Sequence, residues 1–413
     1  MEITIDKLSY GGAGVGRVDG KVVFVDGGVP GDKLKIKLVE EKESYSRAEI
    51  EDFIVRSEKR TEPECKFFTN CGGCNWQDVN YKTQLIEKQQ IVSDSLQRIG
   101  KLAEYELDDI AVSPKEYGYR NRVLLTVFKE NDEYRIGYFE EGSGQNISID
   151  KCVIASDEIN GVISVLIKYF ENNKTLIIPF DKIYLLSSYK KISISFLQSE
   201  KSHKSESQEI VQNVIEYIEK NLAGISLDHR LEFEFMGYQF TSSPYLFNQA
   251  NYEINKEIIH TVAGWIEPIK KNSLLDLYCG IGNFSIAFSK NFEKITGVDS
   301  SGESIKLAKR NADVNDLVNI NFIHDKCRKY IEKLKEAPDF LLADPPRNGM
   351  KELLAHINRI KPKNIIYISC NPATLSRDLK VLTESNYKIN RIKPFDMFPQ
   401  TYHVEIATWL KLI

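Results

Sequence analysis

Cys370 is the residue of this chain whose position most directly suggests chemistry. It lies in the stretch YISCNPATLSRD (367–378), directly after a run of strand-forming residues. A cysteine in such a place is often a small buried packing residue, so its surroundings must decide whether it is reactive. A carboxylate, Glu405, lies in QTYHVEIATWL (400–410), near the start of the last predicted strand. A thiol and a carboxylate at the mouth of one sheet could act as a nucleophile and a base.

A nucleophile and a base of these types suit methylation of a pyrimidine at carbon 5. Carbon 5 of uracil is a weak nucleophile, but addition of a thiolate at carbon 6 gives an enolate whose carbon 5 is nucleophilic. After methyl transfer, a base must remove the proton on carbon 5 so that the thiol can be expelled. We therefore predict Cys370 as the nucleophile and Glu405 as the base. The alternative for Glu405 is a solvated charge at a sheet edge.

A second motif, LLDLYCGIGNFS (274–285), predicts a nucleoside-binding turn. Asp276 ends a strand and precedes Gly280 and Gly282, which let the backbone pass close to a ligand. Asp299 ends the next strand, where a carboxylate takes ribose hydroxyls in dinucleotide folds. The third glycine of the dinucleotide fingerprint is missing, which favours a nucleoside without a pyrophosphate. S-adenosylmethionine fits, with Asp325 after the third strand as a further expected contact.

The region that must position these groups shows strands alternating with helices. The predicted strands SLLDLY, KITGVD, NINFIH, DFLLAD and NIIYIS are separated by helical stretches, which specifies a doubly wound parallel sheet. The last two strands, KINRIKPF and HVEIATWLKL, lack an intervening helix and are expected to form an antiparallel edge. The fourth strand ends in ADPPRNG, a stiff turn in the ligand crevice.

The first part of the chain has a different pattern of apolar residues. Residues 1–57 show short period-2 runs between glycine-rich turns, which predict a small β-barrel. A cysteine-bearing segment and a helix at 81–100 follow. The apolar residues of this helix fit one face: Leu85, Ile86, Val92, Leu96 and Ile99. Residues 58–238 are predicted as a mixed α+β central domain, 199–209 as an exposed loop, and 239–413 as the parallel-sheet domain.

Four cysteines outside the catalytic half could bind a metal. Cys65, Cys71 and Cys74 are spaced Cys-x5-Cys-x2-Cys, and Cys152 is a candidate fourth ligand. Four thiolates suit a zinc ion or an iron-sulfur cluster, and the spacing does not decide between them. Cys279 and Cys327 are interpreted as packing residues.

Composition limits the class of protein. The chain has 413 residues, a net charge of −4 and an estimated pI near 6.0, so it lacks the basic footprint that usually marks a nucleic-acid-binding protein. No stretch approaches the roughly 20 apolar residues of a membrane span, and the N-terminus lacks an apolar signal core. We expect a cytoplasmic protein with no membrane partner, and an odd number of cysteines favours metal or catalysis over disulfides.

Taken together, the motifs resemble the RNA uracil-C5 methyltransferases that make 5-methyluridine in 23S ribosomal RNA and in tRNA. FNQAN, DLYCGIGNF, DPPRNG, SCNPATLSRD and FDMFPQTYHVE are similar to successive family motifs, and the N-terminal unit resembles a TRAM domain, an OB-like RNA-binding barrel. The resemblance implies a Rossmann-like class I methyltransferase domain in which S-adenosylmethionine is bound by Gln249, Tyr278, Asp299 and Asp344. It also implies that Cys370 is the nucleophile and Glu405 the base.

The same resemblance implies a [4Fe-4S] cluster on Cys65, Cys71, Cys74 and Cys152. The methylation chemistry needs no electron, so we expect the cluster to be structural or to position RNA. The barrel and the cluster favour 23S ribosomal RNA as the substrate, with tRNA as the alternative, and we expect a monomer.

Four other classes of enzyme or protein fit the motifs less well. RNA cytosine-C5 methyltransferases carry a cysteine in the proline-rich motif, and adenine or cytosine amino-methyltransferases carry an aromatic residue there, whereas this chain has Arg347. Radical iron-sulfur enzymes typically use Cys-x3-Cys-x2-Cys. An RNA-binding module with a decayed methyltransferase half is disfavoured because Gly280, Gly282, Cys370 and Glu405 are intact.

Overall fold

The computed structural model describes residues 1–140, 142–198, 204–222, 224–228, 230–267, 269 and 272–413. The chain divides into two compact units. The first unit comprises Met1–Phe68, Cys74–Pro114 and Ile331–Ile413, and the second comprises Thr69–Gly73 and Lys115–Tyr330. None of the helices in the described residues is long and apolar enough to cross a membrane.

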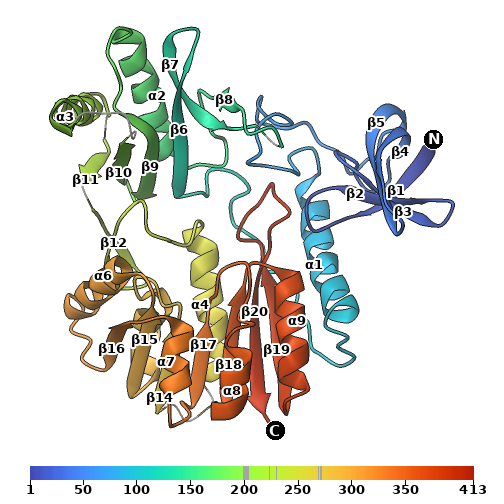
Figure 1. The fold of residues 1–413 in the computed structure, drawn as a ribbon, viewed down its shortest axis with the longest axis vertical. Helices are drawn as coiled ribbons and strands as arrows, with labels where there is room; N and C mark the ends of the chain where they lie inside the picture. The colour runs from blue at the N-terminus through green and yellow to red at the C-terminus, as the bar shows by residue number, and fades with distance from the viewer. Residues whose placement is uncertain (141, 199–203, 223, 229, 268, 270–271) are drawn as a thin grey trace. The chain divides into compact units, whose positions relative to one another are not determined.

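The first unit begins with the predicted barrel, drawn in blue in Figure 1. Five strands close in the order β1-β2-β3-β5-β4. Alternate side chains point inward, and the core is Ile3, Ile5, Val23, Val25, Leu34, Ile36 and Ala48. The strand bounds are β1 (Glu2–Leu8), β2 (Gly14–Val18), β3 (Lys21–Val25), β4 (Lys33–Glu41) and β5 (Tyr45–Val55).

The predicted helix is present as α1 (Tyr81–Arg98), and it begins at Asn80, whose side chain accepts the N–H of Thr83. Val92 and Leu96 are buried as predicted, but Ile86 and Ile99 are 56% and 44% exposed. The helix also buries polar residues: Thr83, Gln84, Glu87 and Lys88. The side chains of Gln84, Glu87 and Lys88 have hydrogen-bond partners elsewhere in the first unit, which apolar periodicity does not reveal.

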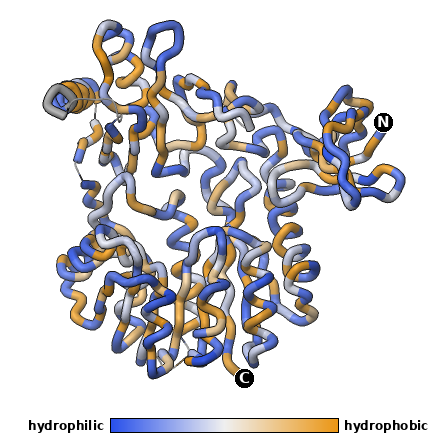
Figure 2. Tube along the Cα trace, in the orientation of Figure 1, coloured by the Kyte–Doolittle hydropathy of each residue, from blue (hydrophilic) through white to orange (hydrophobic). Residues whose placement is uncertain are grey.

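The rest of the first unit holds one run of sheet strands, in the order β17-β18-β20-β19. β17 and β18 are parallel, and β20 is antiparallel to both β18 and β19, which confirms the predicted antiparallel edge. Figure 2 shows how apolar these strands are, and β18 is buried along its whole length. The elements are β17 (Phe340–Ala343), α8 (Leu354–Ile360), β18 (Asn364–Ser369), α9 (Pro372–Thr383), β19 (Tyr387–Phe395) and β20 (Glu405–Leu412).

The second unit begins with a six-stranded sheet in the order β11-β10-β9-β6-β7-β8, and α2 packs on β7 and β9. Part of the predicted loop at 199–209 is helical, because α3 starts at Lys204; residues 199–203 lie outside the described residues. The elements are β6 (Arg122–Glu130), β7 (Glu133–Phe139), β8 (Asn146–Ser148), α2 (Asp157–Asn172), β9 (Phe180–Ser188), β10 (Lys191–Gln198), α3 (Lys204–Asn221) and β11 (Ser226–Asp228).

The second unit ends with a hairpin, a long helix and three parallel strands in the order β16-β15-β14. Along the chain, strands and helices alternate here as predicted. The elements are β12 (Leu231–Phe235), β13 (Tyr238–Ser242), α4 (Tyr252–Ile266), β14 (Ser273–Leu277), α5 (Asn283–Ala287), β15 (Lys294–Asp299), α6 (Gly302–Asp313), β16 (Ile320–His324) and α7 (Cys327–Lys333).

Candidate functional site

Cys370 directly follows β18 and precedes α9. Asn371 caps this helix, since its side chain accepts the N–H of Ala373 at 3.0 Å, and Pro372 occupies the first helical turn. The thiol is half-buried. Burial, followed by the carboxylates of Glu405 and Asp344, raises the pKa of the Cys370 thiol to about 12. The strand end therefore presents a protonated thiol among carboxylates.

Glu405 is the first residue of β20 and is only 6% exposed, so it is not a solvated edge charge. Its Oε2 is buried without a hydrogen-bond partner. Burial, and then the nearby charge of Asp344, raises the pKa of the Glu405 carboxyl well above its usual value, while Arg347 lowers it. A buried carboxyl with a free oxygen and a raised pKa is suited to accept a proton.

Asp344 directly follows β17 and begins the turn DPPRNG. Within this turn, the carbonyl of Arg347 accepts hydrogen bonds from Asn371 Nδ2 at 3.2 Å and Thr374 Oγ1 at 3.1 Å. The Arg347 guanidinium lies 3.2 Å from Nε2 of His403. The start of α9 thus fixes the turn that supplies both Asp344 and a positive charge, and this charge lowers the pKa of Cys370 and Glu405.

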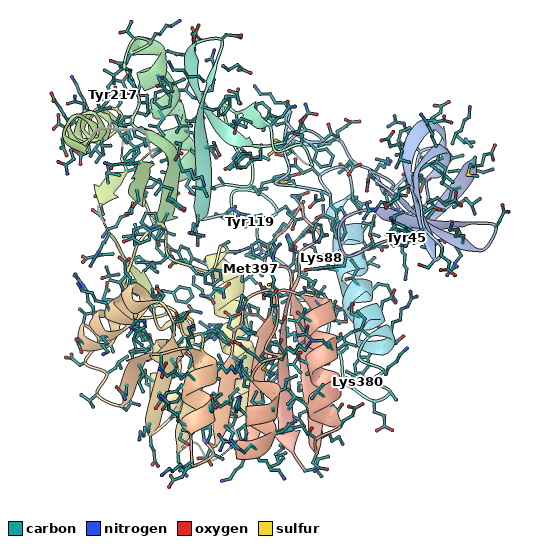
Figure 3. All side chains as sticks on the ribbon, viewed as in Figure 1. Tyr45, Lys88, Tyr119, Tyr217, Lys380 and Met397 are labelled. Atoms are coloured by element: carbon teal, nitrogen blue, oxygen red, sulfur yellow. The ribbon has the colours of Figure 1, made fainter. Side chains whose placement is uncertain are left out.

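The loop between β19 and Glu405 is held by α1, which the sequence did not predict. Lys88 Nζ contacts Asp396 Oδ1 at 2.5 Å and donates to the carbonyl of Phe398 at 2.9 Å. Gln84 accepts the backbone N–H of Gln400 at 2.9 Å and donates to its side chain at 3.0 Å. Figure 3 shows Lys88 on α1 and Met397 on this loop. The helix therefore fixes the approach of the chain to Glu405.

In the second unit, β14 ends at a turn with three residues in the left-handed region. Tyr278 has φ +64°, Gly280 +56° and Gly282 +92°. A non-glycine residue in this conformation costs free energy, and such strain is concentrated at functional sites. A Cβ on Gly280 would meet no atom within 4 Å, whereas one on Gly282 would lie 2.9 Å from the ring of Phe322. Gly280 therefore leaves room for a ligand, and Gly282 permits close packing.

Asp299, at the end of β15, holds this turn from the side. Its Oδ2 accepts the N–H of Gly280 at 3.0 Å, and its Oδ1 accepts the N–H of Ser301 at 2.7 Å. The half-buried Asp325 follows β16, and its N–H donates to the Asp299 carbonyl at 3.2 Å. The predicted residues Tyr278, Gly280, Gly282, Asp299 and Asp325 thus come together at the ends of three neighbouring strands.

The other predicted residues of the second unit have structural contacts. Asp276 is fully buried and accepts the hydroxyl of Ser285 at 2.5 Å, so it holds the turn to α5. Cys279 and Cys327 are buried, as expected of packing residues, and Cys327 Sγ also accepts the N–H of the strained Tyr278 at 3.3 Å. Gln249 is 8% exposed, and its carbonyl accepts Asn121 Nδ2 at 3.0 Å.

None of the four predicted cluster cysteines forms a disulfide, and all four are half-buried. Cys65 and Cys74 belong to the first unit, and Cys71 and Cys152 to the second. Burial and the neighbouring Cys152 and Cys71 are among the causes that raise the pKa of the Tyr138 phenol. Within the described residues, no group of three or more His, Cys, Asp or Glu side chains is arranged to hold a metal ion. The cluster therefore stays a prediction.

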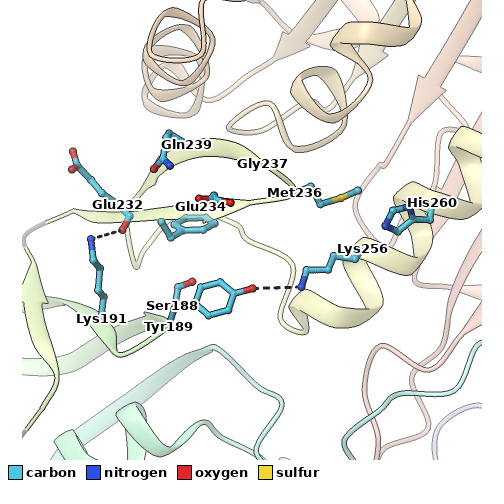
Figure 4. A pocket seen from close by; sticks show the side chains of 11 residues that line it. Ser188, Tyr189, Lys191, Glu232, Glu234, Met236, Gly237, Gln239, Lys256 and His260 are labelled. Carbon is cyan, nitrogen blue, oxygen red and sulfur yellow. Dashed lines mark hydrogen bonds between the residues drawn. The ribbon is translucent and has the colours of Figure 1, made fainter.

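A pocket in the second unit contains none of the predicted site residues. It lies among the β9–β10 turn, the β12–β13 hairpin and α4 (Figure 4). Lys256 donates to the hydroxyl of Tyr189 at 3.4 Å across it, and its charges are mixed, with Glu232 and Glu234 beside Lys191. These contacts give it no evident chemistry.

Two family models match the chain. The family described as tRNA (Uracil-5-)-methyltransferase matches residues 80–413, and the TRAM domain matches residues 1–50. The chain is 30% identical over 427 residues to the 23S rRNA (uracil(1939)-C(5))-methyltransferase RlmD of Shewanella amazonensis, covering 100% of this chain and 96% of the relative. It is 33% identical to an uncharacterized RNA methyltransferase of Clostridium acetobutylicum, covering 100% and 97%.

Among solved structures, the chain is similar to the Pyrococcus abyssi tRNA (uracil-54, C5)-methyltransferase, which was solved with S-adenosyl-L-homocysteine. The TM-score is 0.75 at 25% identity, and the match covers 99% of this chain and 100% of that one. The predicted methyltransferase fold with an N-terminal barrel is thereby confirmed. The chain therefore belongs to the tRNA (uracil-5-)-methyltransferase family and is an S-adenosylmethionine-dependent RNA uracil-C5 methyltransferase that begins with a TRAM domain.

Proposed function

We propose that this enzyme methylates carbon 5 of a specific uridine in 23S ribosomal RNA through a covalent bond between Cys370 and carbon 6. The observation that carries the proposal is the state of Glu405, a buried carboxyl with a raised pKa whose Oε2 has no hydrogen-bond partner. The charge of this carboxyl raises the pKa of the Cys370 thiol, so the two groups are neighbours. A base placed beside a nucleophile is the arrangement that the two-stage chemistry needs.

The proposed reaction balances with these two side chains. The Cys370 thiol loses its proton to solvent as Sγ bonds to carbon 6, and the positive charge of Arg347 favours the thiolate. Carbon 5 then takes the methyl group from the sulfonium, which is left as a thioether. Glu405 accepts the proton from carbon 5, the bond between Sγ and carbon 6 breaks, and the double bond re-forms. The thiolate regains a proton from solvent, and Glu405 releases its proton there.

For the methyl donor, we propose contacts with Gln249, Tyr278, Gly280, Gly282, Asp299, Asp325 and Asp344. Asp299 is the best supported, because its carboxylate already orders the turn through the Gly280 N–H and lies at the end of β15. A carboxylate at this position suits the two ribose hydroxyls. The open space beside the Cα of Gly280 suits close passage of a ligand along the backbone.

Trapping with RNA that contains 5-fluorouridine tests the nucleophile and the base. In 5-fluorouridine a fluorine replaces the hydrogen on carbon 5, so the base has no proton to remove and the adduct cannot break down. The wild type should therefore remain covalently bound to this RNA, and Cys370→Ala should not. Glu405→Gln should form the adduct with ordinary RNA but release methylated product about 10²- to 10⁴-fold more slowly. Equal trapping by Cys370→Ala would refute the nucleophile, and normal turnover by Glu405→Gln would refute the base.

The choice of RNA rests on the relatives. A full-length relative is named as a 23S rRNA enzyme, which supports ribosomal RNA, while the Pyrococcus abyssi neighbour is named as a tRNA enzyme. Methylation of unmodified 23S fragments and of tRNA transcripts, with the product mapped by mass spectrometry, decides between them.

We also propose that the chain has three domains: an RNA-binding barrel at 1–57, a central domain at 58–238 and a methyltransferase domain at 239–413.

We also propose that Cys65, Cys71, Cys74 and Cys152 hold a [4Fe-4S] cluster with a structural role. The support is the set of four half-buried cysteines, none of which forms a disulfide, and the interaction of Cys71 and Cys152 with the buried phenol of Tyr138. Anaerobically purified protein should contain four iron and four sulfide per chain. Cys152→Ser should lose most of the iron, whereas Cys327→Ser should keep it. Zinc in place of iron would refute the cluster.

A further inference from the structure

Tyr10 links the barrel to Cys370, the proposed nucleophile, through a hydrogen bond. It lies in the loop between β1 and β2, and its hydroxyl donates a hydrogen bond to the carbonyl of Cys370 at 3.2 Å. The two residues are 360 positions apart in the sequence. The acceptor of this hydrogen bond is a main-chain carbonyl in the turn between β18 and α9, and the same turn carries the Cys370 thiol.

The loop that carries Tyr10 is well fixed. Gly12 donates to the carbonyl of Ser9 at 3.0 Å, and Ser9 donates to the carbonyl of Ala13 at 2.9 Å. The buried Trp76 donates its indole N–H to the carbonyl of Gly12 at 3.0 Å. Gly12 has φ +98°, and a Cβ there would lie 3.2 Å from the side chain of Asn75. A side chain at this position would be strained and crowded, so the loop is built to keep Tyr10 in place.

The ring of Tyr10 is also held by aromatic neighbours. It meets Tyr402 edge-on, with centroids 5.2 Å apart, and His403 at 6.4 Å. Both neighbours lie in the loop that leads to Glu405. Tyr10 and Tyr402 pack against one apolar cluster: Leu8, Val29, Trp76, Val79 and Ile91. One side chain of the barrel therefore touches the segments that carry both proposed catalytic groups.

The phenol acts as a donor and not as a base. Burial, and then the neighbouring thiol of Cys370, raises the pKa of the Tyr10 hydroxyl above its usual value, so it remains protonated at physiological pH. A neutral hydroxyl that donates to a backbone carbonyl fixes the local main chain.

We propose that Tyr10 is a positioning residue for Cys370: its hydrogen bond to the Cys370 carbonyl fixes the turn and so the direction of the thiol. The barrel is then part of the catalytic site as well as an RNA-binding domain. The inference rests on the proposed role of Cys370 as the nucleophile.

Tyr10→Phe tests this role because it removes the hydroxyl and keeps the ring contacts. The single-turnover methylation rate should fall about 5- to 10-fold, the effect of one hydrogen bond, with unchanged KM for RNA and unchanged S-adenosylmethionine affinity. The matched control is Tyr45→Phe, since Tyr45 lies in the same barrel (Figure 3) and its ring contacts Phe24. This variant should match the wild type. A raised KM with an unchanged rate would overturn the proposal in favour of direct RNA contact.

A second readout does not depend on RNA or on methylation. Iodoacetamide labelling of Cys370, followed by peptide mass spectrometry at a pH where both proteins are folded, reports how well the thiol is held. Tyr10→Phe should label a few times faster than the wild type and Tyr45→Phe equally fast. Faster labelling without any methylation by the wild type would refute the proposed function but support the positioning role. Unchanged labelling and an unchanged methylation rate would overturn that role.

Discussion

Lys88 and Asp396 form an ion pair in which both side chains are fully buried, with Nζ 2.5 Å from Oδ1. Lys88 lies on α1, and Asp396 directly follows β19, 308 residues later. Asp396 also accepts the hydroxyl of Tyr81 at 2.7 Å. The ion pair therefore holds α1 to the loop that precedes Glu405. A substitution that breaks this pair should lower both stability and catalytic rate.

Lys88→Met should lower the free energy of unfolding by about 3–5 kcal/mol, because it leaves the Asp396 carboxylate buried without its counter-charge. Urea denaturation followed by circular dichroism measures the change. Adding Asp396→Asn to the same chain should recover part of the loss, since the remaining buried group is then neutral.

Lys380→Met is the matched control for this experiment. Lys380 lies on α9 (Figure 3) with its side chain 46% exposed, and its Nζ lies 4.0 Å from Glu384 Oε1. Its replacement should change stability by less than about 0.5 kcal/mol. Equal effects of the two lysine substitutions would contradict a structural role for the buried pair.

Glu405 should make the protein less stable as the pH rises. Its folded pKa is raised by burial and by Asp344, so the folded state holds a proton that the unfolded state releases above about pH 4.3. Stability from this group is therefore lost as pH rises above that value. Glu405→Gln should become more stable relative to the wild type by at most about 1.4 kcal/mol per pH unit. Denaturation at pH 5.5 and 8 measures this, and parallel pH profiles would contradict it.

The thiol of Cys370 should react slowly when no RNA is bound. With its pKa raised to about 12, chiefly by burial and then by Glu405, little thiolate exists at pH 8. Its alkylation should be on the order of a hundredfold slower than that of an ordinary exposed thiol and rise with pH beyond pH 10. Glu405→Gln removes one cause of the shift and should speed alkylation at a pH where the Glu405 carboxyl of the wild type is ionised. A plateau near pH 9 in the wild type would contradict the raised pKa.

Most of the site residues that the sequence predicted lie at or just beyond the ends of strands, and Glu405 lies at the start of one. Cys370, Asp299 and Asp344 could be placed because apolar runs and turns are local signals, and parallel strands present their carboxyl ends at one edge. The buried polar face of α1 could not be placed, because Gln84 and Lys88 bond to Gln400 and Asp396, which lie more than 300 residues away. Tyr10 was missed for the same reason, since nothing near it in the sequence marks its contact with Cys370.

Asp299→Asn should weaken binding of S-adenosylmethionine about 10- to 100-fold, because a charged acceptor contributes roughly 1.5–3 kcal/mol to its hydrogen bonds. The amide keeps the shape of the side chain but loses one acceptor, so either the Gly280 N–H or a ribose hydroxyl loses its partner. Asp316→Asn is a suitable control, since Asp316 follows α6 in the same unit but is not among the predicted contacts. Isothermal titration calorimetry measures both variants. If Asp299→Asn bound as tightly as the wild type while Asp325→Asn did not, the carboxylate that recognises the nucleoside would be the one after β16.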